Sequence, residues 1–214
     1  MFDLTPSQII SRVLILLIAL PVHELAHAYT AHFFGDTTPE RNGRLSLNPL
    51  AHLDPLGTIM LLIAGFGWAK PVPVNPYTLE KRSPSANLLV SLAGPMSNLA
   101  LAILAAIPVR FGLIRLTGST GSFFPSPAEF VLWFIIINLA LMLFNLIPLF
   151  PLDGEKVVSY LLPPNLSRYM EAIRPYGSMI LLGLIILGRM SSIDVIGWIM
   201  DWPLYSLFEL LTGV

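Results

Sequence analysis

The chain has 214 residues, of which 55% are hydrophobic and only 12% are charged, and its mean hydropathy is +0.73. Soluble domains carry about 25% charged residues, so this composition argues against a soluble domain and predicts an all-α polytopic protein with the lipid bilayer as its solvent. The net charge of −1 gives no reason to expect a nucleic-acid partner, and the absence of cysteine excludes disulfides and thiolate metal sites.

The apolar segments predict several membrane spans. The N-terminal sequence lacks the basic leader and cleavage site of a signal peptide, so the first segment, Val13 to Phe34, is expected to remain in the mature protein. Leu88 to Val109 and Ala128 to Ile147 are also long enough to cross about 30 Å of hydrocarbon. Tyr176 to Gly188 is short for a span, and residues 190–214 either cross the membrane or lie at its interface.

The connections between these spans predict their orientation. Leu56 to Ala69 is apolar but short and glycine-rich, which favours a re-entrant element over a crossing. Residues 35–87 and the loop after the third span carry more Lys and Arg than the connection between the second and third spans. By the positive-inside rule the two richer connections are cytoplasmic and the N-terminus is outside. We therefore predict one membrane domain, residues 1–214, with C-terminal helices at about 165–214.

The sequence HELAH places His23, Glu24 and His27 inside the first span, where ionisable groups are costly unless they have a partner or a function. Residues four apart share a helix face, so the two histidines can bind one Zn²⁺. Glu24 can then take a proton from a water that the metal activates. The alternative is a pair of structural histidines hydrogen-bonded inside a helix bundle. Burial in an apolar span argues against that alternative.

A catalytic zinc usually has three protein ligands and one open position. Without cysteine, the third ligand must be His, Asp or Glu. His32 faces elsewhere on the same helix, whereas Asp153 follows the third span after Pro148 and Pro151 interrupt that helix. Because the first and third spans are expected to cross in the same direction, they would deliver the histidines and Asp153 to the same side of the membrane.

Three motifs in order, HELAH, AGPMSN (Ala93 to Asn98) and NLIPLFPLDG (Asn145 to Gly154), resemble the site-2 protease family of intramembrane zinc metalloproteases. The chain is most similar to the compact bacterial branch without PDZ or CBS domains. The resemblance covers about residues 10–160 and implies a three-helix catalytic core in that range. It also implies transmembrane proteins or peptides as substrates, and a zinc near the cytosolic side of the bacterial cytoplasmic membrane. The residues that the resemblance implies are the zinc ligands His23, His27 and Asp153 and the catalytic carboxylate Glu24.

Other residues of these motifs are expected to support the site. The Asn145 amide is a candidate donor to the substrate carbonyl or oxyanion, and a helix cap or an interhelical hydrogen bond is the alternative. Pro95 is expected to kink the second span, and Asn98 to bond to the active-site backbone or to a zinc ligand. Asn138 is expected to have a packing role. The remaining supporting candidates are Gly94, Pro148 and Gly154.

The long connection contains two weaker candidates, His52 and Asp54, for which a loop held by Asx turns is the favoured interpretation over a second metal site.

Further along the same connection, Pro71 and Pro73 lie in the stretch from Gly67 to Leu79 and favour an extended, β-like segment. In an edge strand, the N–H groups of Val72 and Val74 would share one side, where an unwound substrate could bind by strand addition. A connector packed on the core is the alternative.

The motifs predict an intramembrane zinc endopeptidase. The alternative is a metal or proton transporter that uses the same ligands. Transport sites commonly lie between repeated halves, and this chain shows no internal repeat. A third possibility is a binding protein that has kept the fold and lost catalysis. Such a protein would ordinarily lack the catalytic glutamate or one of the metal ligands, and this chain has all four residues: His23, Glu24, His27 and Asp153.

Overall fold

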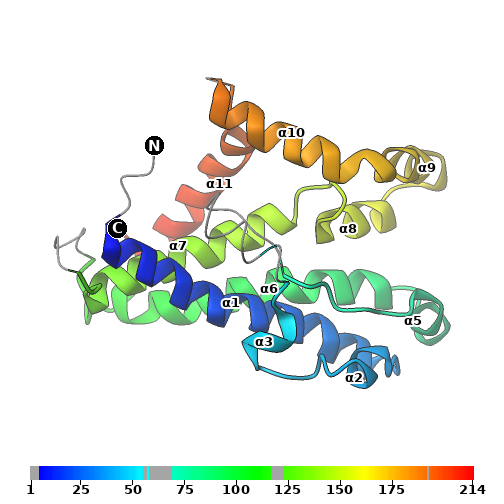
Figure 1. Ribbon diagram of the computed structural model, residues 1–214, viewed down its shortest axis with the longest axis horizontal. Helices are drawn as coiled ribbons and strands as arrows, with labels where there is room; N and C mark the ends of the chain where they lie inside the picture. Colours follow the sequence, from blue (N-terminus) through cyan, green and yellow to red (C-terminus); the bar gives the residue numbers. More distant parts are fainter. Residues whose placement is uncertain (1–4, 55–56, 58–68, 117–122, 192) are drawn as a thin grey trace. The chain divides into compact units, whose positions relative to one another are not determined.

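The computed structural model describes residues 5–54, 57, 69–116, 123–191 and 193–214, and this part of the chain is mainly helical (Figure 1). The predicted re-entrant element, Leu56 to Ala69, lies almost entirely outside the described residues. The helices in chain order are α1 (Pro6–Phe33), α2 (Thr38–Arg41), α3 (Pro49–His52), α5 (Pro76–Arg82), α6 (Ala86–Arg110), α7 (Pro127–Asn145), α8 (Asp153–Leu161), α9 (Pro164–Ile173), the 3₁₀ helix η1 (Arg174–Tyr176), α10 (Gly177–Met190) and α11 (Val195–Thr212).

Among the described residues, four helical segments are long and apolar enough to cross a membrane: α1, α6, α7 and Asn165–Met190. The first three confirm the predicted spans to within a few residues, except that α1 begins seven residues earlier than expected. The fourth is longer than the apolar run at its C-terminal end suggested, because α9 and η1 precede α10. The membrane position of α11 stays a prediction.

No β-strand occurs within the described ranges. Leu53 and Ala69 form an isolated antiparallel bridge, and residues 70–75 are neither helix nor strand. The extended β-like element is therefore seen there as irregular chain rather than as a strand.

The ends of α7 follow from local sequence. Ser126 caps the helix by accepting a hydrogen bond from the Glu129 N–H at 3.1 Å, and Pro127 occupies the first helical position, where its missing N–H costs nothing. The helix ends at Asn145, before Pro148 and Pro151, and α8 begins at Asp153. The expected break between the third span and Asp153 is thus present.

The described chain forms two compact units, and the first consists of residues 16–97. Here the C-terminal part of α1 and the N-terminal part of α6 run antiparallel, because His27 bonds to Val90 while Ala31 packs with Ala86 further along α1. Ala31, Ala86 and Val90 form a buried cluster with Leu79 of α5, and Val74 packs against it. This cluster fixes the loop that precedes α6 against the end of α1.

The second unit comprises residues 1–15 and 98–214. Its core is a cluster between α6 and α7, and α11 covers it with Leu204, Leu207, Phe208 and Leu211. Asn98 donates to Asn138 at 3.0 Å inside this unit, and Asn138 donates to the Phe134 carbonyl at 2.9 Å. Both amides are fully buried, which gives Asn138 the packing role that was expected.

The start of α1 runs parallel to α7 in this unit. Ser7 Oγ donates to Glu129 Oε1 at 2.9 Å, and the Arg12 guanidinium lies 5.1 Å from the centre of the Trp133 ring. The two contacts follow the same order along both helices, so the start of α1 and α7 have the same chain direction within this unit.

Candidate metal centre

His23 and His27 lie one helical turn apart on α1, and both are more than nine-tenths buried. Their Nε2 atoms are 3.0 Å apart, and their rings meet edge to face with centres 4.7 Å apart. Zinc binds histidine nitrogen at about 2.0–2.1 Å, so two nitrogens at this separation can reach the same ion. The HELAH spacing therefore produces a convergent nitrogen pair.

The second nitrogen of His27 has a defined partner. His27 Nδ1 is 2.6 Å from the Val90 carbonyl oxygen of α6. A carbonyl accepts and cannot donate, so the proton of a neutral His27 ring is on Nδ1 and the lone pair is on Nε2. Metal-binding histidines commonly donate their other N–H to a carbonyl in this way. The donor chemistry of the pair thus fits a zinc ion.

Gly94 brings α6 close to these rings. A Cβ atom at this position would overlap with His27 Nε2 and lie 2.5 Å from His23 Nε2 and 2.6 Å from His23 Cε1. Any side chain at position 94 would therefore occupy space next to both ligand nitrogens. Pro95, the next residue, is fully buried inside the same helix.

Glu24 follows His23 on α1 and is 9% exposed. At about 100° per residue, its side chain leaves the helix beside the histidine pair rather than on top of it. Its Oε2 accepts a hydrogen bond from the Val72 N–H at 3.2 Å. The carboxylate is therefore held by the segment that contains Pro71 and Pro73.

Asp153 is the first residue of α8 and is half-buried. A Cβ atom on the following residue, Gly154, would overlap with the Leu146 carbonyl and lie 2.5 Å from the Ile147 oxygen. Gly154 thus allows the start of α8 to pack on the end of α7, while Pro148 lies exposed in the intervening turn. The role of Asp153 as the third ligand stays a prediction.

The Asn145 amide donates to the Leu141 carbonyl one turn earlier at 2.9 Å, a bond within α7 at its last residue. This is the contact of a helix-terminal residue, and the expected oxyanion role stays a prediction. Asn98 was expected to bond to the active-site backbone or to a ligand. One hydrogen bond of Asn98 goes to Asn138, and its expected bond to the site stays a prediction.

His52 and Asp54 have the local roles that a turn-rich loop gives them. His52 is 1% exposed, with Nε2 2.7 Å from the Ser46 carbonyl, and Asp54 accepts the Gly57 N–H at 2.8 Å. Asn48 caps α3 by accepting the Leu50 N–H at 3.1 Å. These contacts fit the Asx-turn interpretation.

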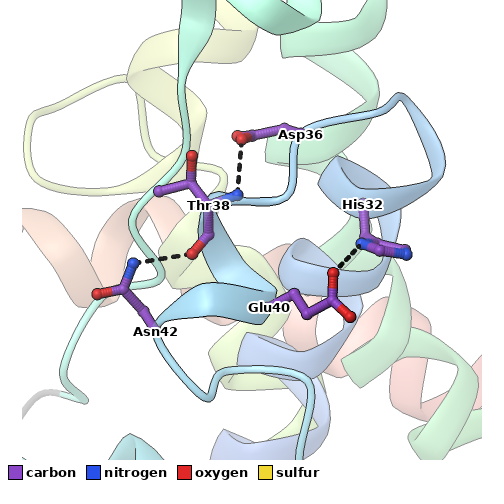
Figure 2. A network of polar contacts seen from close by, with 5 residues as sticks. All are labelled: His32, Asp36, Thr38, Glu40 and Asn42. Carbon is purple, nitrogen blue, oxygen red and sulfur yellow. Dashed lines mark hydrogen bonds and ion pairs between the residues drawn. The ribbon is translucent and has the colours of Figure 1, made fainter.

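His32, also on α1, contacts Glu40. Its Nδ1 lies 3.6 Å from Glu40 Oε2, in the polar network after α1 that Figure 2 shows.

Sequence reasoning missed two buried charged residues, Asp36 and Arg44, which are 2% and 4% exposed. Arg44 entered the prediction only as one of the positive charges of its connection. Nothing in the local pattern marks either residue as buried, since both lie among glycines and polar residues typical of a surface loop. Each has one distant backbone partner, the Asn75 N–H for Asp36 and the Lys70 carbonyl for Arg44.

The sequence profile described as Peptidase family M50 matches residues 112–187, which include Asn145 and Asp153 but not HELAH. The protein named "Putative zinc metalloprotease YwhC" from Bacillus subtilis is 45% identical over 179 residues, which is 81% of this chain and 79% of the relative. The chain belongs to peptidase family M50, the site-2 protease family. The resemblance carried by the three sequence motifs is thus confirmed.

Other relatives of this M50 chain are more distant. "Putative zinc metalloprotease Rip2" from Mycolicibacterium smegmatis is 31% identical over 210 residues, or 92% of this chain and 75% of the relative. "Putative zinc metalloprotease MJ0611" from Methanocaldococcus jannaschii is 32% identical over 142 residues, covering 64% of this chain and 63% of the relative. No solved structure gives a significant match. Family membership and four apolar helices of spanning length together identify an integral membrane protein.

Proposed function

We propose that this M50 chain is an intramembrane zinc endopeptidase that hydrolyses peptide bonds within or near the transmembrane segments of other membrane proteins. The observation that carries the proposal is the buried histidine pair of α1. Its Nε2 atoms are 3.0 Å apart, and a buried glutamate is the next residue after His23. An apolar helix has no structural need for this combination.

His23 and His27 would bind Zn²⁺ through Nε2, and Asp153 would supply the third ligand from the start of α8. The His27 Nδ1 contact to Val90 and the small size of Gly94 support the ligand role of the pair. When bound, zinc would polarise the substrate carbonyl and lower the pKa of a coordinated water.

Glu24 would accept the proton of the attacking water and pass it to the leaving amine, the acid–base role that peptide hydrolysis requires. Asn145 would donate to the carbonyl oxygen as negative charge develops on it. Its amide carries two N–H groups, and the bond to Leu141 uses one of them.

We also propose that the site opens toward the cytoplasmic side of the bacterial cytoplasmic membrane. The argument is the excess of Lys and Arg in residues 35–87 and in the loop after α7. In this orientation α1 runs from outside to inside and carries His23 and His27 into its cytoplasmic half.

A transporter that uses the same ligands is the alternative. A passive ion site gains nothing from a carboxylate beside the first ligand, and transport sites commonly lie between repeated halves. The family assignment also favours the peptidase.

The test is cleavage of single-span model substrates by purified protein in liposomes, with zinc content measured on each sample. Wild type is compared with Glu24→Gln and Asp153→Ala, and the matched controls are His32→Ala on the same helix and Asp201→Ala on α11. We expect Glu24→Gln to keep zinc without cutting and Asp153→Ala to lose zinc, while both controls cut.

Two results would contradict the proposal. Cleavage by Glu24→Gln at the wild-type rate would rule out the glutamate as the base. Zinc flux across the same liposomes without cleavage of any substrate would favour the transporter.

A further inference from the structure

The irregular segment Lys70–Asn75 is fixed at both of its ends. At the first end, the Lys70 N–H donates to the His52 carbonyl at 2.8 Å, and Arg44 Nη1 donates to the Lys70 carbonyl at 3.2 Å. Arg44 Nη1 also donates to the Ala51 carbonyl at 2.6 Å. A guanidinium that is 4% exposed and bonded to two carbonyls from different parts of the loop is a strong anchor for this end.

The second end is held by Asp36, which is 2% exposed. Asp36 Oδ2 accepts the Asn75 N–H at 2.6 Å, and its Oδ1 accepts the Thr38 N–H at 2.9 Å, the bond drawn in Figure 2. Both carboxylate oxygens are therefore used, one toward α2 and one toward the segment. Val74 adds an apolar contact with the cluster around Leu79.

Two prolines interrupt the backbone donors of this segment. Pro71 and Pro73 have no N–H, so the Val72 N–H is the single amide hydrogen between Lys70 and Val74. This N–H donates to Glu24 Oε2 at 3.2 Å. Two buried charged residues, Arg44 and Asp36, therefore fix the two ends of the segment. The Val72 N–H between them bonds to the carboxylate of Glu24, the residue after His23.

We propose that Val72 is a positioning residue whose backbone N–H, held in place by Arg44 and Asp36, orients the Glu24 carboxylate for proton transfer. The inference rests on the proposed peptidase function. An unconstrained glutamate side chain samples several rotamers. An N–H donor bonded to one carboxylate oxygen restricts these rotamers, and the other oxygen is left to accept the proton. This role differs from strand addition, in which the same N–H would bind the substrate backbone.

The test isolates the N–H from the side chain. Val72→Ala keeps the N–H and reports the effect of the side chain alone, whereas Val72→Pro removes the N–H. Because proline can also disturb the backbone, a second variant replaces the residue 72 amide by an ester through the α-hydroxy analogue of valine, which keeps the side chain and replaces N–H with oxygen. Each protein is measured for zinc content, thermal unfolding, kcat and KM on one single-span substrate.

We expect the ester and Val72→Pro to lower kcat by about 10- to 100-fold relative to Val72→Ala, the size of losing a hydrogen bond to a charged group, with zinc content and KM retained. Wild-type kcat in the ester variant would overturn the proposal. A raised KM with kcat retained would also overturn it, because the N–H would then act on the substrate.

The clamp is tested by Asp36→Asn, with Glu40→Gln as the matched control. Both residues lie in the network of Figure 2, but the Glu40 carboxylate is 57% exposed and contacts His32 rather than the segment. We expect Asp36→Asn to lower kcat with zinc retained, and to add little when combined with the ester, since both act through one hydrogen bond. Fully additive effects would show that Asp36 does not act through Val72.

The two proposals fail in different ways. If Glu24→Gln cuts as fast as wild type, the proposed function is wrong whatever the ester does. If Glu24→Gln is inactive with zinc bound while the ester has wild-type kcat, the peptidase stands and the positioning role falls.

Discussion

Replacing Gly94 with alanine should separate zinc binding from stability. The added methyl group would lie 2.5 Å from His23 Nε2 and closer still to His27 Nε2, whereas ordinary contact begins at 3.4 Å. Each ring must therefore move by about 1 Å, or α6 must move away from α1. Metal sites tolerate changes of about 0.2 Å in ligand distance, so a ring movement of this size breaks the site.

The free-energy cost depends on which part moves. Overpacking a core costs about 1–3 kcal/mol when the backbone must shift, but imidazole rings can rotate away at lower cost. The rings are the easier solution, even though His27 would lose its bond to Val90. We expect Gly94→Ala to bind zinc at least about tenfold more weakly, equivalent to about 1.4 kcal/mol, with less than that lost from the free energy of unfolding.

The assay is zinc per chain after dialysis against a graded chelator, measured beside thermal unfolding of the zinc-free protein. Gly183→Ala on α10 is the matched control, because a Cβ there meets nothing within 4 Å in another apolar helix. Wild-type zinc affinity in Gly94→Ala would refute the close approach of α6 to the histidine pair. An equal loss of zinc in Gly183→Ala would show that the effect is not specific to the site.

Three further predictions concern stability and metal dependence. Gly154→Ala should lower the free energy of unfolding by about 1–3 kcal/mol, because its methyl group meets the rigid backbone carbonyls of Leu146 and Ile147, and thermal unfolding against Gly183→Ala would check this. Asn98→Leu should lower the free energy of unfolding by about 0.5–2 kcal/mol, because the buried Asn138 Oδ1 loses the Asn98 donor. In a double-mutant cycle, an Asn98→Leu, Asn138→Leu variant more stable than Asn98→Leu alone would confirm the pairing. Chelation should abolish cleavage, with recovery on adding Zn²⁺ but not Mg²⁺, since a nitrogen-rich site disfavours magnesium; recovery with Mg²⁺ alone would contradict histidine ligation.

The first three spans were predictable because apolar length alone defines them. The exception is the start of α1, where Ser7, Gln8, Ser11 and Arg12 gave no apolar signal. Ser7 and Ser11 are fully buried all the same, and Ser7 meets the buried Glu129 of α7. A polar residue buried by a partner more than a hundred positions away cannot be recognised from its own neighbours in the sequence.

The same distinction holds at the candidate site. The spacing of His23 and His27 predicts their convergence because both are on one helix, where four residues make about one turn. The Val90 carbonyl, the close approach of Gly94 and the Val72 N–H depend on which face α6 turns toward α1 and on how residues 36–75 fold. The AGPMSN motif drew attention to Gly94. The physical reason for a glycine there is the space that the two imidazole rings need, and the sequence does not show which residues those rings face.

The proposed metal ligands His23 and His27 and the proposed base Glu24 all lie on α1, which has a consequence for how mutations act. The positions of His23, Glu24 and His27 relative to one another follow from helix geometry, so variation elsewhere changes the direction in which a side chain points rather than where its backbone lies. Val90 and Gly94 of α6 contact or crowd the histidine rings, and the Val72 N–H bonds to Glu24. Zinc affinity and kcat should therefore respond to different sets of substitutions, the first to changes on α6 and the second to changes at Asp36, Arg44 and Val72. Variants of the second set that lost zinc as readily as those of the first would show that base and ligands are held by one support.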